Sequence, residues 1–378
     1  PLLQLLFGMD DTKRYLSPAP FYHAAPLRFC LATHALGATI VAMEHFDAEE
    51  YLQLVDQYDI THSQVVPTMF VRMLKLPEAA RRQYDLSSLR VCTFCAEPTS
   101  PTVQQFGMDL LAPWYINSYW ATEHGGIAWT HFYGNGDFPL RADAHTYPLP
   151  WIMGDVWAEV TPDDVDAEAP LAPHARGDGT GVPYRRAALE EKGEIVIAAP
   201  YPYLARTVWG DSENFRVEGA RVVPEWKGDI ERWTSTYWSR WKGVWAYTQG
   251  DFAMRYDDDS FSLHGRSDDV INVSGHRMGT EEIEGAILRH RQLDPDSPVG
   301  NVIVVGAPHR EKGLTPLAFV KPTAGRTLTQ DDKRRLSELV RFEKGAVAVP
   351  ADFIEVTQFP ETRSGKYVRR MVRALVEG

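Results

Sequence analysis

Cysteine, net positive charge and long apolar runs are all scarce in this sequence. Only three of the 378 residues are cysteine, an odd and sparse set unlike a disulfide framework, which favours a reducing cytoplasm. No apolar run approaches the roughly 20 residues of a membrane-spanning helix, and the mean hydropathy is −0.31. Acidic residues outnumber basic ones by 51 to 39, which argues against general nucleic-acid binding. We therefore predict a protein with no membrane span and no nucleic-acid partner.

Two of the cysteines, Cys92 and Cys95, have the CxxC spacing that can bind a metal or carry redox chemistry. They lie in the apolar run RVCTFCAEP, with no second CxxC pair and no helix start beside them. This setting favours two buried strand cysteines over a metal or redox site.

Segments with strand and helix patterns alternate through the first half of the chain. The expected helices cover residues 48–58 and 67–76, the second with Pro67 at its first position. The expected strands are 38–43, 61–66, 90–95, 114–120 and 193–198. This alternation predicts an α/β fold with a largely parallel sheet covered on both faces.

Two stretches interrupt this pattern. Residues 132–192 are rich in Pro, Gly and Asp, which predicts a surface dominated by loops. Residues 201–246 are rich in aromatic side chains, and we interpret them as an insertion packed on the main domain. A nucleic-acid stacking surface is disfavoured because the stretch, with seven basic and six acidic residues, lacks the strong net positive charge of such surfaces.

The pattern changes again after residue 265. A helix is expected over 280–290, where Thr280 resembles the start of a capping box, and another over 337–344. Short strands are expected at 301–308, 317–322 and 353–356. We therefore predict two domains, 1–265 and 266–378, the second a small α+β unit of about 110 residues.

Four polar motifs carry the chemical information. They are SYWATEHGG (118–126), YTQGD (247–251), GRSDDVINVSGHRMGTEEIE (265–284) and ETRSGK (361–366). So many Asp, Arg, Gly and Glu residues between short apolar stretches are hard to explain by packing alone. Each motif is weak evidence by itself, but their ordered combination is specific.

In this order, the motifs resemble the C-terminal part of the adenylate-forming acyl-CoA synthetase superfamily. From about Leu89 onward the chain is most similar to acetyl-CoA and propionyl-CoA synthetases and to the ligase part of propionyl-CoA synthase. The resemblance implies part of a large adenylate-forming domain with mostly parallel sheets, followed by a mobile small domain with its hinge at Asp268. It also implies ATP, Mg²⁺ and coenzyme A as cofactors and a small carboxylate as substrate.

The resemblance assigns roles within the large domain. It implies that Thr122 contacts the AMP phosphate and Glu123 binds Mg²⁺, a hard cation that prefers oxygen ligands. It implies that Asp251 holds both ribose hydroxyls. It matches four residues to the adenine pocket, namely Ala96, Glu97, Pro98 and Asn117. Two of them depart from the family pattern, because Ala96 replaces a Gly and Asn117 replaces an Asp.

Trp120 matches the Trp that closes the acyl pocket of the acetate enzymes. A bulky ring in that place leaves room only for a small acid, such as acetate, propionate or 3-hydroxypropionate. The plain alternative is a tryptophan that only fills the core.

Within the small domain, the resemblance makes Lys366 the main catalytic candidate. A mobile ammonium there can offset charge that grows on the α-phosphate and on departing pyrophosphate. Arg266 is matched to a nucleotide contact, Gly275 and Arg277 to the face used for thioester formation, and Arg341 to a coenzyme A phosphate. Without the family context, each of these cations is an ordinary surface residue.

Two features depart from the family pattern. The Gly/Ser/Thr-rich phosphate loop is absent, and the chain begins at Pro1 inside a helix-like run, so we expect an incomplete fragment that is inactive by itself. YLSPAPFYHAAPL (15–27) resembles medium- and long-chain acyl-CoA ligases instead. The open alternatives are such a ligase, an enzyme that loads a carrier protein, or a non-catalytic nucleotide-binding module. Fused downstream enzyme domains are also possible.

Overall fold

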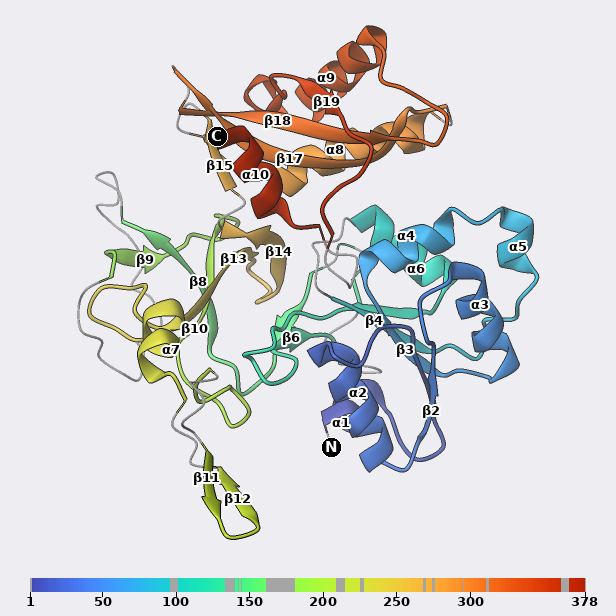
Figure 1. The fold of residues 1–378 in the computed structure, drawn as a ribbon, viewed down its shortest axis with the longest axis vertical. Coiled ribbons are helices and arrows are strands. Elements are labelled where there is room, and N and C mark those ends of the chain that lie inside the picture. Colours follow the sequence, from blue (N-terminus) through green and yellow to red (C-terminus); the bar gives the residue numbers. More distant parts are fainter. Residues whose placement is uncertain are drawn as a thin grey trace. The chain divides into compact units, whose positions relative to one another are not determined.

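The fold is seen in a computed structural model (Figure 1), which describes residues 2–95, 101–132, 140–141, 143, 145–160, 181–208, 215–224, 228–267, 270–273, 276–294, 296–310, 313–361 and 367–377. The chain forms two compact units, Pro1–Leu263 and His264–Gly378. Asp268, the predicted hinge, lies outside the described residues. The predicted hinge and the predicted boundary between residues 265 and 266 therefore stay predictions.

The first unit contains a five-stranded sheet in which every pairing is parallel. In spatial order its strands are β2 (Thr39–Ala42), β1 (Arg14–Ser17), β3 (His62–Val65), β4 (Val91–Phe94) and β5 (Trp114–Asn117). The predicted α/β class with a parallel sheet is confirmed.

Helices pack on both faces of this sheet. They are α1 (Leu2–Phe7), α2 (Ala24–Ala35), α3 (Ala48–Gln57), α4 (Pro67–Leu74) and α6 (Pro101–Leu110), whereas the short α5 (Glu78–Arg82) buries no side chain and contacts α3. Neighbouring strand residues belong to different apolar clusters: Tyr15 packs with α1 and α2, and Leu16 packs with α3 and α4. Local signals start the helices, because Pro67 opens α4 and the Asp47 carboxylate accepts bonds from the first turn of α3.

In the second sheet of this unit, the second to fifth strands pair antiparallel with their neighbours. Its strands, in order, are β14 (Phe261–Arg266), β13 (Tyr247–Arg255), β10 (Gly193–Ile197), β8 (Gly154–Glu159) and β9 (Tyr184–Arg186). Strand β8 crosses the region that was predicted to consist of loops. The expected strand at 193–198 is present as β10, but in this sheet and not in the parallel one.

The described part of the aromatic-rich stretch holds one helix and two short strands, α7 (Ile230–Tyr237), β11 (Phe215–Glu218) and β12 (Arg221–Pro224). Trp233 of α7 is buried in the same apolar cluster as Tyr15. Two more short strands, β6 (Trp129–Thr130) and β7 (Tyr147–Pro148), pair with each other beside that cluster. The stretch therefore supplies part of the main core.

The second unit is an α+β fold built on one mixed sheet. Its strands are β16 (His276–Gly279), β15 (Val270–Val273), β18 (Gly313–Pro322), β17 (Val299–His309) and β19 (Phe353–Glu355), with β19 parallel to β18. Helices α8 (Thr280–Leu293), α9 (Gln330–Lys344) and α10 (Arg369–Glu377) and a short 3₁₀ turn (Ala346–Ala348) accompany them. The predicted small α+β domain is present.

One detail of the second unit differs from the sequence prediction. Gly279, and not Thr280, is the N-cap of α8, and no side chain caps this helix end. The full capping box lies at α9, where Thr329 and Asp332 exchange bonds. A Thr followed by acidic residues fits both positions, and only the backbone path decides which one caps.

Candidate functional site

The SYWATEHGG motif follows the carboxyl end of strand β5, on the parallel sheet. Asn117 ends the strand and is buried, at 5% exposure. The backbone of Tyr119 forms an isolated antiparallel β-bridge with Trp129. Further along the motif, Thr122 is exposed and Glu123 is half-buried. A hydroxyl and a carboxylate therefore leave the core together beyond the carboxyl edge, the usual place for ligands in such sheets.

The turn after Glu123 is held by neighbouring backbone and two tyrosines. Gly125 has a φ of +76°, and a Cβ there would lie 1.6 Å from the carbonyl oxygen of Tyr203. The Tyr203 hydroxyl donates to the carbonyl of Ile127 at 3.0 Å, and Tyr201 donates to the carbonyl of His124 at 3.0 Å. The glycine is thus required both by its backbone conformation and by a close approach.

The Glu123 carboxylate accepts a hydrogen bond from the aromatic-rich stretch. The hydroxyl of Tyr237, at the end of α7, donates to Oε1 of Glu123 at 2.8 Å. The Tyr237 ring stacks on Tyr247 with a centroid distance of 5.5 Å and an interplanar angle of 5°. Sequence reasoning missed Tyr237, because nothing in the sequence near it relates it to a residue 114 positions away.

The Asp251 carboxylate belongs to strand β13 of the second sheet. Its Oδ2 accepts a hydrogen bond from the Tyr119 hydroxyl at 2.7 Å. Burial, followed by the charges of Glu123 and nearby groups that include Asp251, raises the pKa of Tyr247 well above its ordinary value. Tyr247 therefore lies near both carboxylates, and the structure brings Glu123 and Asp251 into one neighbourhood.

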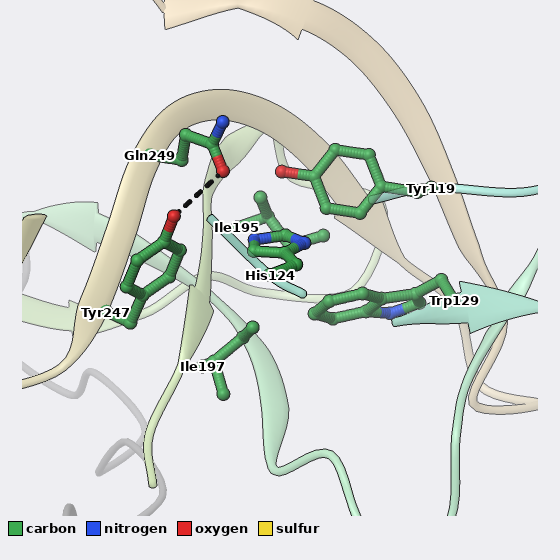
Figure 2. A pocket seen from close by; sticks show the side chains of 7 residues that line it. All are labelled: Tyr119, His124, Trp129, Ile195, Ile197, Tyr247 and Gln249. Carbon is green, nitrogen blue, oxygen red and sulfur yellow. Dashed lines mark hydrogen bonds between the residues drawn. The ribbon is translucent and has the colours of Figure 1, made fainter. Parts of the chain in front are cut away.

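A small hollow lies at this meeting point (Figure 2). Its lining residues are Tyr119, His124, Trp129, Ile195, Ile197, Tyr247 and Gln249. The His124 ring lies edge-on to Tyr119 and to Tyr247, at 5.5 and 5.2 Å between centroids. Burial lowers the pKa of His124 to about 3, so this side chain is a neutral packing group at pH 7 and not an acid catalyst.

Trp120 does not line this hollow. It is partly buried and packs against the apolar cluster that also contains Trp129. This position serves core packing, and its predicted second role as the wall of an acyl pocket stays a prediction.

The remaining predicted site residues belong to the second unit or lie outside the described residues. Arg266 is exposed at the end of β14, Arg341 is exposed on α9, and the backbone of Arg277 belongs to β16. The residues outside the described part of the chain are Ala96, Glu97, Pro98, Gly275 and Lys366. The functions assigned to all of these residues stay predictions.

The described residues offer no metal centre built from protein ligands alone. No group of three or more His, Cys, Asp or Glu side chains among them could hold a metal ion. None of the three cysteines forms a disulfide, all are buried, and burial raises the pKa of the Cys92 thiol to about 12. The predicted burial of Cys92 and Cys95 is confirmed, with Cys92 in β4 and Cys95 directly after that strand. No described helix has the length and apolar character needed to cross a membrane.

Solved structures with the same fold include several at low sequence identity. An anthranilate CoA ligase in complex with anthranoyl-AMP matches with a TM-score of 0.72 and 18% identity, over 99% of this chain and 61% of that one. ATP-bound MatB from Rhodopseudomonas palustris matches with a TM-score of 0.71 and 17% identity, over 99% and 62%. These likenesses confirm the fold.

Curated relatives are more similar in sequence. An acetyl-coenzyme A synthetase of Pyrobaculum arsenaticum is 31% identical over 341 residues, 89% of this chain and 43% of the relative. The acetyl-coenzyme A synthetase of Thiobacillus denitrificans is 32% identical over 356 residues, 91% and 47%. The chain thus spans about half the length of the curated relatives it matches.

Family matches cover both units. Residues 2–205 match the AMP-binding enzyme family, and residues 282–366 match the AMP-binding enzyme C-terminal domain. The first match alone covers more than half of the chain, and the parallel sheet with Glu123 beyond its carboxyl edge lies within it. The chain belongs to the AMP-binding enzyme family.

Proposed function

We propose that this protein is an ATP-dependent ligase that joins a small carboxylate to coenzyme A through an acyl-AMP intermediate. The observation that carries the proposal is the convergence of Glu123 and Asp251 beside Tyr247, next to the exposed Thr122. One carboxylate suits a phosphate-bound cation, and the other suits a pair of ribose hydroxyls. Two such acids at one sheet edge match the two ends of a nucleoside phosphate.

The reaction has two steps that balance without a protein nucleophile. A carboxylate oxygen of the acid attacks the α-phosphorus of ATP, and the bond to the β-phosphate oxygen breaks to release pyrophosphate. The thiolate of coenzyme A then attacks the acyl carbon, and AMP leaves with its oxygen. The protein's part is to position the reactants and to offset phosphate charge. The buried cysteines are consistent with this, because neither step needs a protein thiol.

The described residues fit Mg²⁺ as a partly protein-bound ion. Mg²⁺ takes one or two carboxylates plus waters and substrate phosphates, so a three-ligand protein cluster is not needed. Among the described residues, Tyr237 is the one side-chain donor to the Glu123 carboxylate, which leaves Oε2 for a cation. Mg²⁺ held there would neutralise charge on the phosphates. The Thr122 hydroxyl would donate to the α-phosphate, and Asp251 would accept from the ribose.

The second unit would complete the site in this proposal. Lys366 would approach the α-phosphate during adenylation, and rotation about Asp268 would then turn Gly275, Arg277 and Arg341 toward coenzyme A. What supports this part is the family match over residues 282–366 and the compact, separate character of the unit. Hinged units of this kind move about a few backbone positions.

The substrate class in this proposal is a short acid such as acetate, propionate or 3-hydroxypropionate. Supporting this are the acetyl-coenzyme A synthetases among the relatives and the position of Trp120 two residues before Thr122. A pocket walled by an indole distinguishes acids by volume, at roughly 1 to 3 kcal/mol per methylene.

Carboxylate-dependent exchange of labelled pyrophosphate into ATP by the full-length protein tests the proposal. We expect exchange with acids of two or three carbons, and its loss in Glu123→Gln and Asp251→Asn. Glu49→Gln is the matched control, since Glu49 also accepts from a tyrosine, Tyr84, but lies on α3. Exchange only with long acids would reject the substrate class. Nucleotide binding without exchange with any acid would favour the non-catalytic module.

A further inference from the structure

Tyr237 makes a contact with Glu123 that the family motifs do not include. The hydroxyl of Tyr237 is 2.8 Å from Oε1 of Glu123, and the two residues are 114 positions apart. Tyr237 is the last residue of α7, in the aromatic-rich stretch of residues 201–246. A phenol that donates to a carboxylate makes a charge-assisted bond, which is stronger and more directional than a neutral one.

The Tyr237 ring is itself held by other aromatic rings. It stacks on Tyr247 at 5.5 Å with an interplanar angle of 5°, and it lies 4.8 Å from the ring of Trp233. Trp233 is 5% exposed and belongs to the main apolar cluster of the unit. The position of the hydroxyl is therefore set by the core and not by the flexible surface.

A fixed donor restricts what the Glu123 carboxylate can do. A glutamate side chain has rotatable bonds up to its terminal group, and that last torsion is broad when nothing constrains it. With Oε1 bonded to Tyr237, the carboxylate plane is restrained and Oε2 is the oxygen left to bind a cation. The restraint lowers the ordering cost of binding, which is how preorganised groups strengthen affinity.

We propose that Tyr237 is a positioning residue that orients the Glu123 carboxylate for Mg²⁺ bound to nucleotide phosphate. This inference rests on the proposed function, because it assigns a ligand to Glu123. It gives α7 a functional task beyond packing. A purely structural Tyr237 would instead stabilise α7 and the core without any specific effect on the cation.

The first test compares Tyr237→Phe with Tyr84→Phe in the full-length protein. Both changes remove one hydroxyl that donates to a glutamate, but Tyr84 bonds Glu49, an exposed residue of α3, at 3.3 Å. We expect Tyr237→Phe to raise the Mg²⁺ concentration needed for half-maximal pyrophosphate exchange about five- to tenfold, the effect of one charge-assisted bond. The affinity for AMP without Mg²⁺ should not change. Tyr84→Phe should match the wild type in both measurements.

A second test does not depend on catalysis. Tb³⁺ is a hard cation whose luminescence is sensitised by nearby aromatic rings, and it can be titrated into the full-length protein with ATP present and no acid, so that phosphate oxygens complete its ligands as they would for Mg²⁺. We expect binding that Glu123→Gln abolishes, that Tyr237→Phe weakens about five- to tenfold and that Tyr84→Phe leaves unchanged. Wild-type affinity in Tyr237→Phe would overturn the inference, as would the absence of any Tb³⁺ binding that depends on Glu123.

The two tests separate the inference from the proposed function. Tb³⁺ binding that depends on Glu123 and Tyr237, without pyrophosphate exchange by the wild type, would support the positioning role and reject the ligase. Pyrophosphate exchange by the wild type, with unchanged Mg²⁺ dependence in Tyr237→Phe, would support the ligase and reject the positioning role. A parallel fall of AMP affinity, Mg²⁺ affinity and melting temperature in Tyr237→Phe would show a structural role and reject the inference.

Discussion

The phenol of Tyr119 donates a hydrogen bond to Oδ2 of Asp251 at 2.7 Å and joins residues that are 132 positions apart. Tyr119 follows the last strand of the parallel sheet, and Asp251 lies within strand β13 of the second sheet. The bond therefore ties the two sheets of the first unit together at the proposed nucleotide site. It also holds the acid that we expect to bind the ribose.

Replacing Asp251 should weaken nucleotide binding directly. Asp251→Asn removes the negative charge and one of two acceptor oxygens, so we expect the affinity for AMP to fall about tenfold or more. Isothermal titration calorimetry of the full-length protein with AMP measures this effect. Asp257→Asn, at an exposed position shortly after the same strand, should bind AMP as the wild type does. Unchanged affinity in Asp251→Asn would remove this residue from the site.

Gly125 should tolerate no side chain. Gly125 and Gly243 share a φ of +76°, but a Cβ at Gly125 would meet the Tyr203 carbonyl oxygen at 1.6 Å, whereas a Cβ at Gly243 meets nothing within 4 Å. We expect Gly243→Ala to cost about 1 kcal/mol of unfolding free energy for its backbone conformation alone. Gly125→Ala should cost at least about 2 kcal/mol more, because the backbone around Tyr203 must move.

Urea unfolding followed by tryptophan fluorescence measures this difference for the first unit, which contains both glycines. All 11 tryptophans precede residue 264, so the signal reports on the first unit. Equal destabilisation by the two alanines would show that the turn at Gly125 yields without strain.

The first unit should lose stability in mild acid. Burial lowers the pKa of His131 from 6.5 to about 4. Between these two pH values the histidine is protonated in the unfolded chain and neutral in the folded chain. The stabilising contribution is thus complete above pH 6.5 and decreases as the pH falls toward 4. Between pH 7.5 and pH 5 we expect a loss of about 2 kcal/mol from this residue.

His131→Phe isolates this contribution. Among the described residues, neither ring nitrogen of His131 has a hydrogen-bond partner, and its ring meets Tyr147 edge-on at 5.4 Å, so phenylalanine keeps the ring contact and loses none of these bonds. Urea unfolding at the two pH values should show a smaller loss for this variant than for the wild type. His34→Asn, at an exposed position, should follow the wild type. An equal acid loss in His131→Phe would assign the effect to other groups.

A partly buried ion pair should hold the C-terminal helix of the second unit. Arg369 of α10 donates to both oxygens of Glu284 on α8, with one distance of 2.6 Å, and Glu284 is 9% exposed. Removing the arginine leaves a buried carboxylate without its cation, so Arg369→Ala should cost about 3 to 5 kcal/mol. Arg289→Ala breaks the more exposed pair with Glu343 in the same unit and should cost less than about 1 kcal/mol.

Hydrogen exchange of β17 and α10 is the measurement that suits this unit, because it contains no tryptophan. Faster exchange in Arg369→Ala than in Arg289→Ala is the expected result. If the two variants exchange alike, the pair between Arg369 and Glu284 does not anchor the helix.

Local chemistry was enough to predict several elements from the residues alone. Pro67 opens α4 because its fixed φ and missing N–H suit the first helical turn, and the run at 90–95 forms β4 because it is short and largely apolar. The antiparallel sheet could not be predicted in this way. A run such as 193–197 looks the same in either kind of sheet, since strand orientation depends on partners far away in the chain.

The sequence by itself determined the α/β class, the family and the identity of the candidate acids, because short apolar runs and ordered motifs are local properties. Only the tertiary structure decided which phenol meets which acid: Tyr237 reaches Glu123, and Tyr119 reaches Asp251. The chain contains many hydroxyl and carboxylate groups, and any of these hydroxyls could donate a hydrogen bond to any of these carboxylates. Packing of the core selects the pairs, since it alone sets which side chains come within hydrogen-bonding distance.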